Sequence, residues 1–233
     1  MKIISYNKKG IKELLSKHST SVFNVFEVNG TTQKIYKDVM FDLEKYHRVV
    51  RPFSYANIDQ LEWLSAQQAY IKSTSLPNGV IITDNYPVGV CYPKYFFDYE
   101  NFHYLITKSP QLVLANLRQA VEKNIELMER GIHNYDFVFN NILFKGDDVQ
   151  LIDIDGKYVS SYPSYRRVYA YFLPEMIGLL YAIVNQQYDE KDAKKIINEF
   201  RERIEKINTK EIPIDYPCKI LDELEKTQIL RLK

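Results

Sequence analysis

Apolar side chains recur every three or four positions around residue 120, which is the pattern of one helix face. Ser109 and Pro110 occupy the places of an N-cap and a first helical residue. Gly131 stands where a glycine often ends a helix. The pattern therefore predicts a helix over residues 109–131. Its apolar face consists of Leu114, Leu117, Val121, Ile125 and Met128.

The same periodicity predicts helices elsewhere in the chain. Residues 57–71 form one amphipathic candidate, and residues 189–208 form a longer one with a single apolar face. Residues 173–185 are mostly apolar and predict a buried helix. A last helix is expected within residues 212–233, whereas residues 11–15 fit either a short helix or a strand.

Short apolar runs separated by turn residues predict three β-hairpins. Asn29-Gly30, in the first, is a strong signal for a tight hairpin turn. In the third, a polar turn over residues 145–148 contains Gly146. The paired strands are residues 21–28 with 31–39, 80–83 with 88–92, and 141–144 with 149–152.

The composition is that of a globular protein rather than a disordered one. Apolar residues make up 45% of the 233 residues, and the formal net charge of +1 implies neither a nucleic-acid nor a membrane partner. The two cysteines are too far apart in sequence to form a metal-binding pair, and the N-terminus lacks the apolar core of a signal peptide. An apolar run over residues 169–184 is interrupted by Pro174 and Glu175, so we expect it not to span a bilayer. These features predict a reduced, cytoplasmic environment.

The third hairpin carries the most distinctive chemistry of the chain. Asp136 lies five positions before Asn141, and the returning strand ends at Asp153. A hairpin brings its two open ends together, so these three side chains are expected at one edge. Carboxylate and amide oxygens are hard ligands of the kind that Mg²⁺ prefers. This stretch therefore predicts a magnesium site.

The motif D-x-x-x-x-N, here Asp136 to Asn141, is followed by Ile142-Leu143, a hairpin and then Leu151-Ile152-Asp153. This order resembles the protein-kinase-like superfamily, which includes protein kinases and small-molecule phosphotransferases. The resemblance covers about residues 15–156. It implies an α+β, two-lobed protein-kinase-like fold, with a β-rich N-lobe over residues 1–93. A mainly helical, shortened C-lobe over residues 94–233 would carry the catalytic and metal hairpin at residues 136–155.

The resemblance also implies ATP and Mg²⁺ as cofactors and gives the hairpin residues roles. Asp136 would accept a hydrogen bond from the acceptor hydroxyl and act as its base or orient it, while Asn141 and Asp153 would hold Mg²⁺. Asp155 would either approach a second metal ion or face solvent.

In the N-lobe, the resemblance gives Lys37 the role of neutralising the α and β phosphates, with Lys34 as a competitor. Glu62, or else Asp59, would orient that lysine. Ile35 and Lys37 are two positions apart, so in a strand they point to the same face. The other residues that the resemblance places at the nucleotide are Val22, Ile35, Tyr92 and Leu143.

Two departures from the family pattern bear on activity. The segment over residues 16–23, where the family has a glycine-rich phosphate loop, contains no glycine. Asn134-Tyr135-Asp136 replaces His-Arg-Asp, so phospho-activation of the usual kind is not expected.

The sequence leaves three interpretations open. The first is an ATP-dependent phosphotransferase, of the Ser/Thr protein-kinase type or acting on a small-molecule hydroxyl. The second is a pseudokinase that binds nucleotide or protein as a regulatory module. The third is an unrelated α/β protein with an acidic hairpin. Residues 157–171 contain Lys157, Arg166 and Arg167 but no acidic residue, which disfavours a cationic acceptor.

Overall fold

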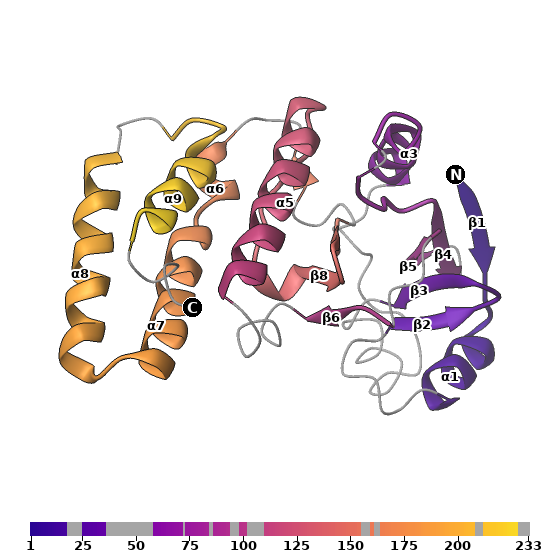
Figure 1. The fold of residues 1–233 in the computed structure, drawn as a ribbon. Coiled ribbons are helices and arrows are strands. Elements are labelled where there is room, and N and C mark those ends of the chain that lie inside the picture. The colour runs from indigo at the N-terminus through magenta and orange to yellow at the C-terminus, as the bar shows by residue number, and fades with distance from the viewer. Residues whose placement is uncertain are drawn as a thin grey trace. The chain divides into compact units, whose positions relative to one another are not determined.

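The computed structural model describes most of the chain and divides it into two compact units. The described residues are 1–17, 25–35, 58–71, 73–83, 86–93, 98–101, 110–154, 159–160, 164–207 and 212–227. Unit 1 consists of Met1–Asp98 with Ile154–Lys157, and unit 2 consists of Tyr99–Asp153 with Tyr158–Lys233. The α+β class expected from the sequence is confirmed (Figure 1).

Unit 1 is built on a mixed five-stranded sheet with the strand order β1-β4-β5-β3-β2. Strand β1 runs parallel to β4, and the other neighbours are antiparallel. The strands are β1 (Lys2–Ser5), β2 (Val25–Val28), β3 (Thr31–Ile35), β4 (Gly79–Thr83) and β5 (Tyr86–Tyr92). The first two predicted hairpins are thus present as β2–β3 and β4–β5, whereas the sequence did not predict β1.

The β2–β3 turn has the geometry that its sequence favours. Val28 pairs with Thr31 across the two-residue loop. Asn29 and Gly30 both have positive φ angles, 51° and 72°. A type I′ turn needs positive φ at both central positions, and Asn-Gly adopts it at the lowest cost.

The described residues of unit 1 include the helices α1 (Lys8–Lys17) and α3 (Ile58–Gln67). Helix α3 contacts β4 and buries Leu61 and Leu64 completely. The segment that fitted either a helix or a strand is therefore helical, as α1, and its Ile11 is fully buried.

Gly89 marks the closest approach between strands in unit 1. It lies opposite Ile35 in the register of β3 and β5. A Cβ atom built on Gly89 would stand 2.1 Å from the carbonyl oxygen of Lys34. No side chain fits at that distance, so the strand pair depends on this glycine.

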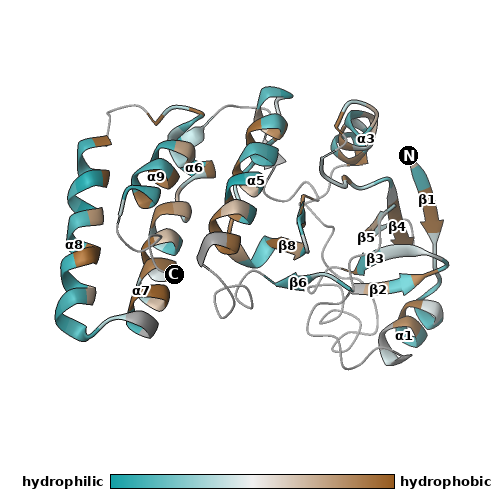
Figure 2. Cartoon of the chain, viewed as in Figure 1, coloured by the Kyte–Doolittle hydropathy of each residue, from teal (hydrophilic) through white to brown (hydrophobic). Residues whose placement is uncertain are grey.

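Unit 2 is mainly helical. In the part of unit 2 that the structure describes, the helices are α5 (Pro110–Glu129), α6 (Tyr165–Val168), α7 (Phe172–Gln187), α8 (Glu190–Ile207) and α9 (Tyr216–Glu225). Helix α7 packs on α8 and α9, and α9 also packs on α5. Figure 2 shows α8 with a polar outer face, while its buried residues are Ala193, Ile197, Phe200 and Ile204. The long helices thus follow the predicted apolar periodicity.

Among the described residues, one helical stretch is long and apolar enough to cross a membrane, Tyr165–Asn185. It is longer than the apolar run identified in the sequence. Its α7 part contacts α8 and α9, and its Phe172, Met176 and Val184 are at most 1% exposed. Length and composition alone make weak evidence for a membrane span, and 44% of the apolar window is buried within the protein.

The described residues of unit 2 also form two small sheets. One has the order β6-β8-β9, with β6 (Glu100–Asn101), β8 (Ile142–Lys145) and β9 (Asp148–Leu151). The other pairs β7 (His133–Asn134) with β10 (Val159–Ser160). The third predicted hairpin is β8–β9, with one correction: Asn141 ends a short 3-10 helix, η1 (Phe139–Asn141), and the strand begins at Ile142.

Candidate active site

Helix α5 ends in a way that fixes the direction of the following loop. Gly131 has a φ of +78°. The amide of Ile132 donates to the carbonyl of Leu127 at 2.9 Å, and the amide of Gly131 donates to that of Met128 at 2.9 Å. This double closure is a Schellman motif, which turns the chain sharply out of a helix. It sends the chain directly into the stretch that carries Asp136.

The backbone before Asp136 is held by a buried asparagine. Asn134 is 1% exposed and pairs with Val159 across the β7–β10 ladder. Its side-chain Oδ1 accepts a hydrogen bond from the amide of Asp136 at 3.1 Å. This is the turn that an asparagine makes with the backbone two residues further on. Asn134 therefore orients Asp136.

Asn141 makes the most informative contact of the site. Its Nδ2 donates to both the carbonyl oxygen and the carboxylate Oδ2 of Asp136, each at 2.9 Å. Both amide hydrogens are thereby used, and in the part of the chain that the structure describes Oδ1 of Asn141 accepts no hydrogen bond. The Asp136 carboxylate is held in one orientation, and an amide oxygen remains available as a hard ligand.

A glutamate from α7 supports the turn between these two residues. The amide of Phe139, the first residue of η1, donates to Oε2 of Glu175 at 2.7 Å. Val138, the N-cap of η1, provides no side-chain cap of its own. Glu175 thus caps η1 from 36 positions away, and the sequence analysis did not single it out. A carboxylate early in an apolar helix was its only signal.

Phe137 fixes the same loop on its apolar side. This residue, next to Asp136, is 2% exposed. Its ring stacks on Phe172 with a 5.8 Å centroid separation and meets Tyr169 edge-on at 6.3 Å. The Tyr169 hydroxyl donates to the carbonyl of Ile214 at 2.8 Å, and burial raises the pKa of this phenol far above its usual value. The loop is therefore packed on α7 by aromatic contacts.

The hairpin brings Asp153 to the same end as Asn141. Ile142 pairs with Leu151, and the amide of Ile152 donates to the carbonyl of Asn141 at 2.9 Å. Asp153 follows with a φ of +63°. Aspartate enters this left-handed region more readily than most residues, yet the conformation is uncommon and concentrates at functional sites.

The far end of the hairpin is bonded to neighbouring elements. Gly146 alone has a positive φ in the two-residue turn, 59°, as in a type II′ turn. Asp148 accepts hydrogen bonds from the hydroxyl of Tyr99 and, at 2.6 Å, from Gln150. Lys123 of α5 lies 3.8 Å from the Asp148 carboxylate and donates to the carbonyl of Val149. These contacts fix the hairpin on α5.

The remaining predicted site residues belong to separate elements or lie outside the described residues. In unit 1, Ile35 and Tyr92 are buried, 1% and 5% exposed, and Glu62 is exposed on α3. Leu143 is half-buried in β8. Val22, Lys37 and Asp155 lie outside the described residues. The structure thus brings Asp136 and Asn141 into contact and places the backbone of Asp153 at the same end of the hairpin.

Within the described ranges, no group of three His, Cys, Asp or Glu side chains could hold a metal ion. A metal site at the hairpin would therefore combine the Asn141 amide oxygen with the Asp153 carboxylate and further oxygens from a ligand. Such a mixed set of hard donors is what Mg²⁺ sites use when phosphate and water complete the coordination.

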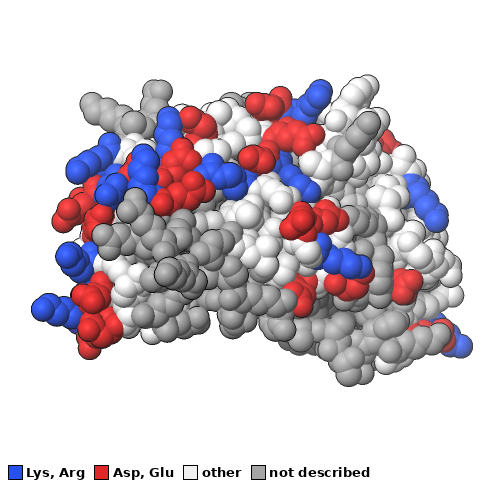
Figure 3. Space-filling view, viewed as in Figure 1, with Lys and Arg blue, Asp and Glu red and all other residues white. Residues whose placement is uncertain are grey.

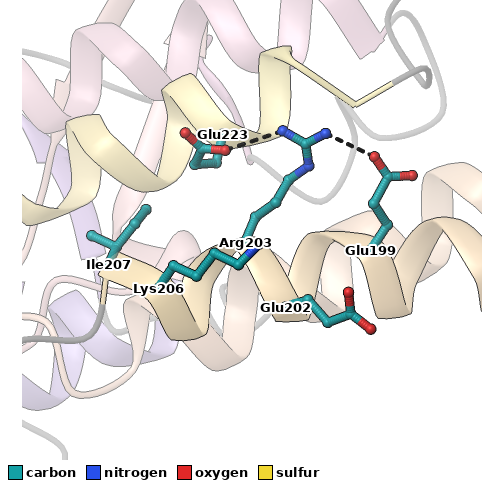
Figure 4. Close-up of a pocket in the computed structure, with 6 residues that line it drawn as sticks. All are labelled: Glu199, Glu202, Arg203, Lys206, Ile207 and Glu223. Atoms are coloured by element: carbon teal, nitrogen blue, oxygen red, sulfur yellow. Dashed lines mark hydrogen bonds and ion pairs between the residues drawn. The ribbon is translucent and has the colours of Figure 1, made fainter.

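A separate hollow of about 410 Å³ lies between α8 and α9 (Figure 4). Arg203 bridges Glu199 at 2.9 Å and Glu223 at 3.4 Å. The other lining residues are Glu202, Lys206 and Ile207. Charges of both signs intermix over these helices (Figure 3). We therefore interpret the residues that line the hollow as a surface ion-pair network rather than as a ligand site.

Comparison with protein-family models and with curated proteins gives no match to this chain. Its function therefore has to be argued from its own residues.

Proposed function

We propose that the chain is an ATP-dependent phosphotransferase that transfers the γ-phosphoryl group to a hydroxyl, with a two-lobed protein-kinase-like fold. One observation carries the proposal. The Asn141 amide donates both of its hydrogens to Asp136 and leaves its oxygen for a metal ion. Asn141 would thus orient the base through its amide nitrogen and bind the metal ion through its amide oxygen, and phosphoryl transfer needs both the positioning and the metal ion.

The chemistry assigned to Asp136 is simple. The acceptor oxygen forms a bond to the γ-phosphorus, and the bond from that phosphorus to the bridging oxygen breaks. ADP leaves with the electron pair, and the hydroxyl proton passes to the Asp136 carboxylate. Asn134 and Asn141 hold this carboxylate and its backbone, so it accepts the acceptor hydroxyl without reorganising.

Asn141 and Asp153 are the residues that would hold Mg²⁺. When bound, the ion would neutralise the phosphate charge that develops during transfer. The donor set fits, because Asn141 precedes β8 and Asp153 follows β9, so that the hairpin brings both residues to its open end.

The nucleotide contacts of unit 1 belong to the same proposal. Lys37 neutralises the α and β phosphates, and Glu62 or Asp59 orients it. Val22, Ile35, Tyr92 and Leu143 line the adenine site. Support for this part comes from the motif resemblance alone.

A nucleotide-binding pseudokinase is the second candidate. It is favoured by the absence of glycine from residues 16–23, where backbone amides would have to approach the phosphates closely. The two candidates differ in turnover, so the same protein preparation distinguishes them.

The decisive experiment is transfer of labelled phosphate from ATP in the presence of Mg²⁺, with wild type, Asp136→Ala and Asp147→Asn compared. Asp147 is exposed in the hairpin turn and serves as the matched control. We expect transfer by wild type and Asp147→Asn, and loss in Asp136→Ala. Binding without transfer, seen as a nucleotide-dependent rise in melting temperature only, supports the pseudokinase. Absence of both effects refutes both candidates.

A further inference from the structure

Helix α6 places a guanidinium over the ring of the residue that precedes the proposed base. The Cζ atom of Arg167 lies 5.9 Å from the ring centroid of Tyr135, the residue directly before Asp136. Helix α6 also contacts β7, and the rings of Tyr165 and His133 are 6.1 Å apart. Tyr165 and Arg167 of α6 therefore lie against the segment that leads into Asp136.

Arg166 and Arg167 are both exposed, and no carboxylate of the described residues lies within ion-pair distance of either. Two other arginines of unit 2 behave differently: Arg118 pairs with Asp222 and Glu225, and Arg203 pairs with Glu199 and Glu223. Residues 157–171 contain no Asp or Glu that could neutralise the α6 pair locally. Among the described residues, these two adjacent positive charges therefore have no ion-pair partner, and Arg167 lies over Tyr135 of the loop.

The chemistry of this pair favours an anionic ligand. A guanidinium stacked on an aromatic ring keeps its N–H edge free, and that edge matches the two oxygens of a carboxylate or phosphate. An acceptor with such a group near its hydroxyl would be repelled by Asp136. Positive charge on the adjoining helix would offset that repulsion.

We propose that Arg166 and Arg167 bind an anionic group of the phosphoryl acceptor, a carboxylate or a phosphate next to the reacting hydroxyl. This inference rests on the proposed phosphotransferase. It makes the two arginines determinants of acceptor specificity and gives them no part in nucleotide binding.

The test is a steady-state assay with two pairs of acceptors. Glycerol 3-phosphate is compared with glycerol, and a serine peptide flanked by Asp and Glu is compared with the same peptide flanked by Lys. The double variant Arg166→Gln/Arg167→Gln is set against Arg201→Gln. Arg201 is a matched control, because its Cζ lies over the Tyr181 ring at the same 5.9 Å.

We expect the wild type to prefer an anionic acceptor, either glycerol 3-phosphate over glycerol or the acidic peptide over the basic one. The KM for that anionic acceptor should rise about 10-fold in the double variant, as for loss of charge-assisted hydrogen bonds. The kcat, the KM for ATP and the Arg201→Gln values should stay unchanged. Preference for the small anion over the acidic peptide, or the reverse, identifies the acceptor class.

The inference is overturned if neither anionic acceptor is preferred, or if the double variant and Arg201→Gln behave alike. Hydrolysis of ATP without acceptor, measured in parallel, reports on the phosphotransferase itself. If the wild type hydrolyses ATP but prefers neither anionic acceptor, only the role of the arginines is contradicted, whereas absence of all ATP turnover contradicts the proposed function.

Discussion

The carboxylate of Glu175, on α7, accepts a hydrogen bond from the backbone amide of Phe139 at 2.7 Å. This contact joins the main core helix of unit 2 to the short turn between Asp136 and Asn141. A buried or half-buried amide without a partner costs free energy, so a side chain that satisfies it also fixes the turn.

Replacement of Glu175 by alanine should loosen this turn. The lost hydrogen bond leaves the Phe139 amide unsatisfied, and the free energy of unfolding should fall by about 1–3 kcal/mol. The Mg²⁺ concentration for half-maximal transfer should rise as well, because Asn141 ends the same turn. Urea unfolding and a Mg²⁺ titration of the rate measure the two effects.

Two further variants make this test specific. Glu175→Gln keeps an oxygen acceptor and should restore most of both properties. Glu202→Ala, at an exposed position of α8, should change the unfolding free energy by less than about 0.5 kcal/mol. Equal losses in Glu175→Gln and Glu175→Ala would show that the hydrogen bond is not the cause.

The role of Asn141 can be tested against its neighbour Asn140, which is exposed in the same turn and serves as a control. Asn141→Ala removes both hydrogen bonds to Asp136 and should lower kcat/KM by about 10–100-fold, as for loss of a group that orients a site residue. Asn141→Asp should do at least as much, because a carboxylate cannot donate and repels Asp136. Asn140→Ala should behave as wild type in the same transfer assay. A wild-type rate for Asn141→Ala would remove the observation on which the proposed function depends.

Asp153 has a positive φ angle and carries a negative charge, and different substitutions can test these two properties separately. Because its φ is +63°, Asp153→Ala should cost about 1–2 kcal/mol of unfolding free energy, while Asp153→Gly should be tolerated. Asp153→Asn keeps a residue type that adopts this conformation but removes the charge. We expect it to lose the Mg²⁺-dependent part of the ATP-induced rise in melting temperature with little change in the free protein. A full Mg²⁺-dependent rise in Asp153→Asn would exclude the carboxylate as a metal ligand.

Two glycines provide a paired test of the fold. Gly89→Ala would force a Cβ to 2.1 Å from the Lys34 carbonyl, so unit 1 should lose about 1–3 kcal/mol or more through displacement of the strands. Gly178 lies within α7, and no heavy atom lies within 4 Å of a Cβ added there. Gly178→Ala should therefore stabilise the protein by about 0.5–1 kcal/mol, because alanine favours a helix. Thermal unfolding of the two variants should show shifts of opposite sign.

Local patterns predicted the parts of the fold that depend on local forces. The apolar spacing around residue 120 predicted α5, and Gly131 marked its end. Asn29-Gly30 predicted the β2–β3 turn. Strand β1 was missed, because four residues without clear alternation give no strand signal and their partner, β4, lies about 75 residues further along the chain.

The candidate site shows the same difference between local patterns and long-range contacts. Asp136, Asn141 and Asp153 were found because their spacing lies within one hairpin. Glu175 was missed because its link to Phe139 depends on tertiary packing. Asn134 was noted only as a departure from the family pattern, although its side chain bonds the Asp136 amide. Contacts of this kind have no signal in sequence periodicity.

The bond between Lys123 and the hairpin has a consequence for local unfolding. Helix α5 leads through Gly131 into the loop, and its Lys123 contacts Asp148 and Val149 at the other end of the same hairpin. The hairpin cannot open at its turn without breaking contacts to α5. The amide hydrogens of β8 and β9 should therefore exchange with solvent together with those of α5, as one cooperative unit, so that the loop that carries Asp136 opens only together with α5.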